Sequence, residues 1–284
     1  MSVGVGLNKN TDKVKEIVDI YFAEKNVKIE EYDDSRRIFY IDEVKRKALN
    51  RRDFYDITTS MILDIILNIY SKDMIEKQIN SIPNSFKVWE KKKVAEISEE
   101  ILLDRDRFIV EKEYIYNKIK DYIRETPFIW IDGFVQFRLR KFNFFIDLVI
   151  EKGIKEFNAE KEYEEFIKVL QYFVDIQEPK HSLVNLIFED SDYKLYDEMN
   201  NIIDRDFFKE IIEEIGSEDI SRDDLLVSSL IVIAPKKLKI HLGERHKNKD
   251  VIRIIANVFQ DRVYFCYGCE QCNKSIKMKR DKRY

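Results

Sequence analysis

The C-terminal fold is decided by residues 238–266, which read LKIHLGERHKNKDVIRIIANVFQDRVYFC. Leu238, Ile240 and Leu242 alternate with polar residues, as in a half-buried strand. Residues 251–259 have the apolar spacing of a helix, and residues 262–266 predict a second strand. A strand, a helix and a strand with short joins form a βαβ unit, so the two strands are expected to be parallel with a right-handed crossover.

Three cysteines follow the second strand, Cys266, Cys269 and Cys272, with two residues between neighbours. Thiolates at this spacing can bind one ion from a tight loop, as in zinc ribbons and iron–sulfur proteins. His241 closes the first strand and Cys266 closes the second, and parallel strands bring such residues to the same carboxyl edge of a sheet. We therefore expect His241 as the fourth ligand, with His246 in the following loop as the alternative.

The cysteine cluster allows three interpretations. A Cys₃His set is a closed, structural zinc site, whereas a cluster with one non-cysteine ligand is an iron–sulfur centre with redox activity or an open iron. Three reduced thiols without a metal are the third interpretation. Zinc is favoured over an iron–sulfur cluster as the cofactor, and a dithiol switch is disfavoured because Cys-x-x-Cys does not open a helix here.

The last eleven residues, 274–284, form a basic tail. Its basic residues are Lys274, Lys277, Lys279, Arg280, Lys282 and Arg283, against one acid. A metal site followed by basic residues is one way to hold a nucleic-acid backbone, so nucleic-acid binding is an alternative function. A solubilising terminus is favoured, because Tyr284 is the tail's one aromatic residue for base stacking and the whole chain has a net charge of −4.

Residues 1–50 predict a small N-terminal βαββ unit. Val3 and Val5 belong to its first strand, and Thr11 can cap the helix that follows. Gly4-x-Gly6 precedes this helix, as in phosphate-binding loops. The third glycine of a dinucleotide fingerprint is absent, so an ordinary turn is the favoured interpretation.

Residues 51–178 predict a helical bundle, with a helical pattern throughout residues 53–177. Thr58, Thr59 or Ser60 is expected to cap its first helix. The apolar spacing indicates helical stretches that end near residues 81, 103, 126 and 157, and a last one from Ala159 to the break at Pro179. Five apolar faces of this kind bury one another most simply in a bundle.

Residues 179–273 predict a C-terminal α/β domain, made of a hairpin over 183–196, two short helices and the βαβ unit. The expected fold class is therefore α+β, mostly α: a central helical bundle flanked by the N-terminal βαββ unit and a C-terminal α/β unit with a parallel βαβ. Only 7 glycines and 4 prolines occur in 284 residues, which favours long helices with short connections.

The composition and the lack of a targeting segment indicate a folded intracellular protein. Hydrophobic residues make up 44% of the chain, enough for a sizeable core in about two domains. Residues 1–10 lack the pattern of a secretory signal, and the apolar stretch 225–234 is about half the ~20 residues of a membrane span. Crowded cysteines suit a reducing compartment, so we expect a cytoplasmic protein without a membrane span.

Motifs of common enzymes are absent from the sequence. It has no Gly-x-Ser-x-Gly elbow, no phosphate-binding P-loop and no His-Glu-x-x-His, and it contains 3 histidines. A non-catalytic interaction or regulatory protein, with protein partners, is the favoured function. A metal or redox enzyme at the βαβ edge, using His241, Glu244 and His246, is the remaining alternative.

Four strings, in the same order, resemble the YtxC-like family of sporulation proteins from endospore-forming bacteria. They are IDGFVQFRLR at 131–140, EKEYEEFIKVLQYFVDIQEP at 160–179, APKKLKIH at 234–241 and CYGCEQC at 266–272. The resemblance covers roughly residues 129–272 and is weaker in the first half of the chain. It implies a role in sporulation and a cytoplasmic location, and it carries no established activity, cofactor or catalytic residue.

Overall fold

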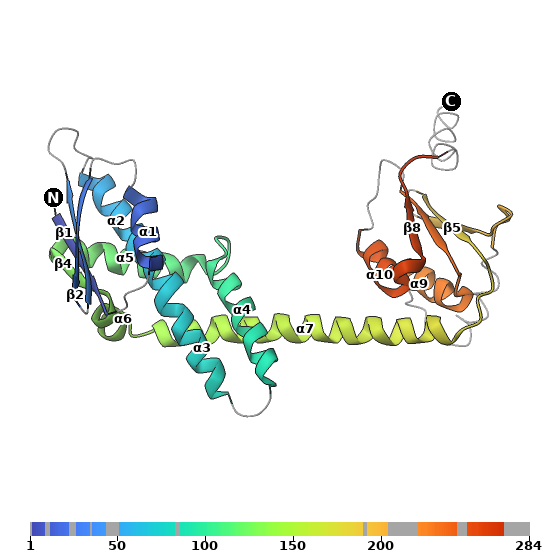
Figure 1. The fold of residues 1–284 in the computed structure, drawn as a ribbon, viewed down its shortest axis with the longest axis horizontal. Coiled ribbons are helices and arrows are strands. Elements are labelled where there is room, and N and C mark those ends of the chain that lie inside the picture. Colours follow the sequence, from blue (N-terminus) through green and yellow to red (C-terminus); the bar gives the residue numbers. More distant parts are fainter. Residues whose placement is uncertain are drawn as a thin grey trace. The chain divides into compact units, whose positions relative to one another are not determined.

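The computed structural model describes residues 2–8, 12–22, 27–34, 36–43, 51–82, 86–189, 192–203, 221–242 and 249–269. Contacts within the chain divide it into two compact units, residues 1–160 and 161–284. Each unit holds one four-stranded sheet with helices beside it (Figure 1). The fold is α+β and mostly α, as expected from the sequence.

The first unit contains a mixed sheet in the order β2-β3-β1-β4. Its elements are β1 (Ser2–Leu7), α1 (Asp12–Phe22), β2 (Val27–Asp34), β3 (Arg36–Glu43) and β4 (Phe128–Trp130). The first four form the expected βαββ unit, in which β1 and β3 are antiparallel. β4 pairs parallel to β1 and lies in the segment that we expected to be entirely helical, so that expectation is wrong at residues 128–130.

Gly4 and Gly6 serve packing across this sheet. A Cβ atom on Gly4 would lie 2.4 Å from the ring of Phe128, and one on Gly6 would lie 2.3 Å from the ring of Trp130. The two rings stack on each other with centroids 6.2 Å apart. The glycines are therefore needed because aromatic side chains of β4 lie directly over β1.

Helices make up the rest of the first unit. They are α2 (Arg51–Ile65), the π-helix η1 (Ile66–Tyr70), α3 (Ser71–Ser81), α4 (Val88–Leu103), α5 (Ile109–Glu125), α6 (Ile131–Arg138) and the first part of α7 (Phe142–Ile176). Residues of β1, α2, α5 and α7 share one core, which includes Val5, Ile65, Ile119 and Val149. The four-segment domain organisation stays a prediction, because a division by contacts does not show which segments fold alone.

Two expected helix boundaries are wrong. α2 is already helical at Arg51, so Thr58, Thr59 and Ser60 lie inside it, where their hydroxyls donate hydrogen bonds to the carbonyls four residues earlier. α7 is continuous through Ala159, and the chain instead leaves the helix between α6 and α7. Neither Asn158 nor Ala159 is a strong helix breaker such as proline or glycine, so the local sequence does not end the helix there.

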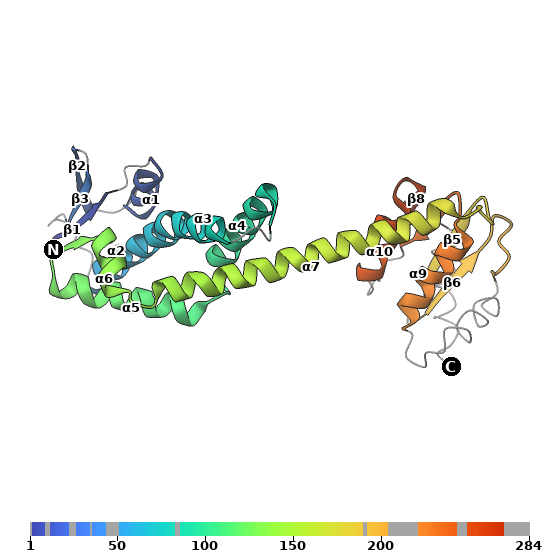
Figure 2. The same cartoon turned by 90° about the horizontal axis from the view of Figure 1, so that it is seen from below.

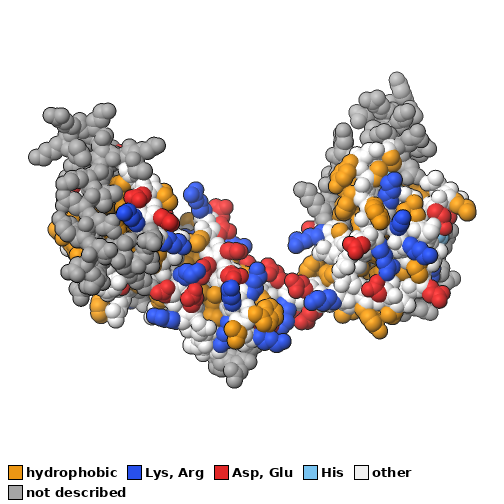
Figure 3. Space-filling view, in the orientation of Figure 1, with side chains coloured by type: hydrophobic (Ala, Val, Ile, Leu, Met, Phe, Trp, Pro, Cys, Tyr) orange, Lys and Arg blue, Asp and Glu red, His pale blue; other side chains and the backbone are white. Residues whose placement is uncertain are grey.

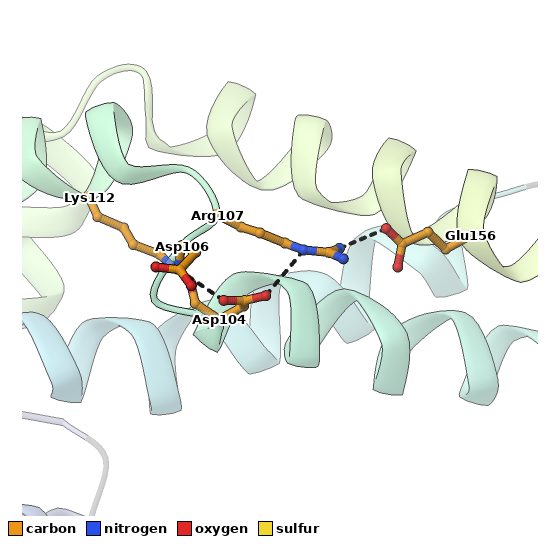
Figure 4. A network of polar contacts seen from close by, with 5 residues as sticks. All are labelled: Asp104, Asp106, Arg107, Lys112 and Glu156. Carbon is orange, nitrogen blue, oxygen red and sulfur yellow. Dashed lines mark hydrogen bonds and ion pairs between the residues drawn. The ribbon is translucent and has the colours of Figure 1, made fainter. Parts of the chain in front are cut away.

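The connection from α4 to α5 is fixed to α7 by a small polar network (Figure 4). Arg107 places Nε 3.2 Å from a carboxylate oxygen of Asp104 and Nη1 2.7 Å from Oε1 of Glu156. The backbone N–H of Asp106 donates to the same Asp104 carboxylate, and Lys112 donates to the Asp104 carbonyl. One guanidinium group therefore links the turn after α4 to α7.

The second unit has a sheet in the order β6-β5-β7-β8. After the end of α7 come β5 (Val184–Glu189), β6 (Asp192–Tyr196), α9 (Arg222–Ile233), β7 (Leu238–His241), α10 (Lys249–Phe259), the 3₁₀ helix η2 (Gln260–Arg262) and β8 (Val263–Cys266). β5 and β6 form the expected hairpin, and β7 and β8 are parallel neighbours joined through α10. The predicted βαβ unit is confirmed. Of the two expected short helices, one is α9 and the other lies outside the described residues.

The two faces of this sheet differ. Figures 1 and 2 show α9 and α10 beside the strands, and the core on that side contains Val184, Leu186, Leu238 and Ile240. Successive side chains of a strand point to opposite faces. His241 is therefore on the other face of the sheet.

Candidate metal centre

The register of β7 and β8 places His241 directly opposite Cys266. The pairing continues one residue further, where the N–H of Leu242 donates to the carbonyl of Cys266 over 2.8 Å. Both residues end parallel strands, so they lie at the carboxyl edge of the sheet, as the sequence predicts. The local fold that brings them together is the βαβ unit itself.

Three of the expected ligands converge. The nearest ligand atoms of His241, Cys266 and Cys269 all lie within 4.8 Å of one another, and Nδ1 of His241 is 3.3 Å from Sγ of Cys269. Around tetrahedral zinc, neighbouring sulfurs are about 3.8 Å apart and a sulfur and a nitrogen about 3.6 Å apart. The arrangement therefore suits one ion with small adjustments of the side chains.

His241 is 2% exposed, while both cysteines are partly buried. Burial lowers the pKa of His241 below its ordinary value, and the positive charge of Lys239 lowers it further. The ring is therefore biased toward its neutral form, which is the form that binds metals.

Asn185 on β5 is a site residue that the sequence analysis missed. Its Oδ1 lies 3.1 Å from Nε2 of His241, and its side chain is buried, with 6% exposed. One signal was present in the sequence: asparagine is uncommon in strands, yet here it stands in the apolar run 184–188. A buried polar side chain in such a run needs a hydrogen-bond partner.

Other candidates lie outside the described residues. These are Cys272, His246, Glu244 and the basic residues Lys274, Lys277, Lys279, Arg280, Lys282 and Arg283. The remaining histidine, His181, lies elsewhere, with Nδ1 3.4 Å from a carboxylate oxygen of Glu198. On the face drawn in Figure 3, Lys and Arg side chains are interspersed with Asp and Glu.

A model of the YtxC-like family matches residues 56–264, well over half of the chain. The chain belongs to the YtxC-like family. The matched range of this YtxC-like protein contains Asn185 and His241 and ends two residues before Cys266. The resemblance found in the sequence is thereby confirmed.

A curated relative of this YtxC-like protein is Uncharacterized protein YtxC of Bacillus subtilis (strain 168). It is 28% identical over 153 residues, which are 54% of this chain and 53% of the relative. The similarity therefore spans about half the length of that protein. No solved structure matches the chain. Within the described part of this YtxC-like protein, no helix combines the length and apolar character needed to cross a membrane.

Proposed function

We propose that this YtxC-like protein is a non-catalytic interaction or regulatory protein whose C-terminal unit holds a structural zinc ion. The convergence of His241, Cys266 and Cys269 carries the proposal. As the fourth ligand we propose Cys272, which follows Cys269 by three residues in the sequence and lies outside the described residues. Zinc bound to three thiolates and one imidazole has a full tetrahedral shell.

A structural role suits this position better than a catalytic one. Four protein ligands would fill the tetrahedral shell of the proposed site, whereas a catalytic zinc keeps an open position for water or substrate. The ligands come from the ends of β7 and β8 and from the chain that follows. Bound zinc would join these segments, so its binding free energy would stabilise the sheet edge.

We also propose a cytoplasmic location and a role in sporulation. Three closely spaced cysteines, Cys266, Cys269 and Cys272, suit a reducing compartment. The link to sporulation rests on the four strings that resemble the family. Deletion of the gene in its spore-forming host should lower the yield of heat-resistant spores, and a yield equal to that of the parent strain would refute the link.

Metal analysis of protein purified without oxygen tests the zinc site. We expect about one equivalent of zinc per chain and no visible absorption bands. Cys269→Ser and His241→Ala should lose the zinc and melt at lower temperature, because each removes one ligand. His181→Ala is the matched control, since His181 pairs with Glu198 and is not one of the converging ligands, and it should keep the zinc. Iron–sulfur absorption bands, or no metal, would contradict the proposal.

A further inference from the structure

We propose that Asn185 is a positioning residue that makes Nδ1 of His241, and not Nε2, the nitrogen that binds the metal. This inference rests on the zinc site proposed above. It concerns a residue on β5, outside the βαβ unit that carries the ligands.

The first step of the argument is the hydrogen bond between the two side chains. Asn185 is paired with Lys239 in the parallel register, so Asn185 and His241 lie on the same face of the sheet, on adjacent strands. Oδ1 of Asn185 is 3.1 Å from Nε2 of His241. An amide oxygen can only accept a hydrogen bond, so Nε2 must carry the ring proton in the neutral imidazole. The lone pair is then on Nδ1, which faces Sγ of Cys269 at 3.3 Å.

The second step is the orientation of the Asn185 amide. Its Nδ2 lies 3.5 Å from the carbonyl oxygen of Asp197, and an amide nitrogen can only donate. This contact directs Nδ2 toward Asp197 and leaves Oδ1 for the imidazole. Asp197 is itself held in a tight loop, because its carboxylate accepts the N–H groups of Met199 and Asn201 over 2.9 and 2.8 Å.

The third step is burial. Asn185 is 6% exposed and His241 is 2% exposed, so little water is available to replace either partner. Loss of the acceptor would remove this hydrogen bond from a buried ring, and with it a contact that orients the ring. Hydrogen bonds of this kind fix the tautomer of a ligand histidine and raise its basicity, and their loss lowers metal affinity about ten- to a hundredfold.

Three variants of the full chain test this role. Asn185→Leu removes the acceptor at similar size, and Asn185→Asp keeps an oxygen acceptor. Asn257→Leu is the matched control, because Asn257 is an asparagine of the same unit whose side chain donates to the hydroxyl of Tyr163. Zinc affinity is measured by competition with a chromophoric chelator. The tautomer is read from ¹⁵N NMR of labelled histidine rings, of which the chain has 3.

We expect zinc affinity to fall about ten- to a hundredfold in Asn185→Leu and to stay within about threefold of wild type in Asn185→Asp and Asn257→Leu. In the wild-type zinc complex, the ¹⁵N spectrum should show His241 coordinated through Nδ1 and protonated at Nε2. Coordination through Nε2 in the wild type, or unchanged affinity in Asn185→Leu, would overturn the role of Asn185 alone. A wild-type protein that binds no zinc would overturn the site itself, and this role with it.

Discussion

The carboxylate of Asp132 links three segments of the first unit, and Tyr70 is one of its hydrogen-bond partners. The hydroxyl of Tyr70 donates to Oδ2 of Asp132 over 2.7 Å, and the backbone N–H of Asn8 donates to the same oxygen over 2.8 Å. Tyr70 belongs to the π-helix η1, Asp132 lies at the start of α6, and Asn8 directly follows β1. Asp132 is the second residue of the string 131–140 that resembles the family, and its role in this structure is to hold these segments in place.

Two tyrosines, Tyr70, which is buried, and Tyr21, which is partly buried, predict a loss of stability in alkali. Burial raises the pKa of Tyr70 and of Tyr21, and the hydrogen bonds and charges of Asp132 and Asp64 raise them further. A folded-state pKa above the unfolded value means that the contribution is complete below about pH 10 and is lost as pH rises toward the folded pKa. Tyrosinate absorbance and circular dichroism should therefore show that these two hydroxyls ionise only as the protein unfolds.

Variants sharpen this alkaline titration. Tyr70→Phe should lower the free energy of unfolding at pH 7 by about 1 kcal/mol and flatten its dependence on pH above 10. Tyr114→Phe is the control, because Tyr114 is 48% exposed and should leave both unchanged. Titration of all tyrosines near pH 10, with the helical signal intact, would contradict the account.

Single residues also show what the sequence could reveal about the site. His241 and Cys266 were predictable as neighbours, because strand periodicity and the parallel rule fix which strand ends meet. Asn185 was not, since its contact with His241 depends on β5 lying next to β7, and nothing local specifies that order. The position of Cys269 was not predictable either, because it depends on the path of the turn after β8.

At the scale of elements, α7 is the clearest difference from expectation. Sequence periodicity predicts a break near residue 158, whereas the helix runs from Phe142 to Ile176. Phe157 belongs to the core of the first unit, and Ile167 and Val174 belong to the core of the second. The apolar face of α7 therefore changes between its first and second parts. In the sequence, this change of face looks like the end of one helix and the start of another.

Substitution at Ala159 tests the continuity of α7. Ala159 is exposed in the middle of the helix, so Ala159→Gly should lower the free energy of unfolding by about 1 kcal/mol. The control is the difference between Arg140→Ala and Arg140→Gly, in the turn before α7, which should be much smaller. Urea denaturation measures both. Equal effects at the two positions would indicate that residue 159 is not helical.

The short strand β4 could not be predicted from the sequence, for a physical reason. β4 has three residues, too few for alternation to distinguish a strand from a helix turn. Its pairing with β1 is visible only in the structure, where Gly4 and Gly6 admit the rings of Phe128 and Trp130. The longer elements of the C-terminal unit were predictable because each carries its own period, and α9 also has a cap, Ser221, that the sequence predicts.

At the scale of the whole molecule, the two units differ in their polar residues. The first unit joins its sheet and helices in one core, with partly buried tyrosine–aspartate pairs between elements. The second unit gathers the residues that can bind an ion at the carboxyl edge of its sheet. The proposed zinc would stabilise this edge of the second unit, because it would join the ends of β7 and β8 to the chain that follows.

X-ray absorption at the zinc edge, on full-length protein purified without oxygen, tests this central claim most directly. The zinc site predicts three sulfur neighbours at about 2.3 Å and one nitrogen at about 2.0 Å. Cys269→Ser should lose this signal. A shell of only nitrogen and oxygen neighbours, or protein that carries no zinc, would contradict the account.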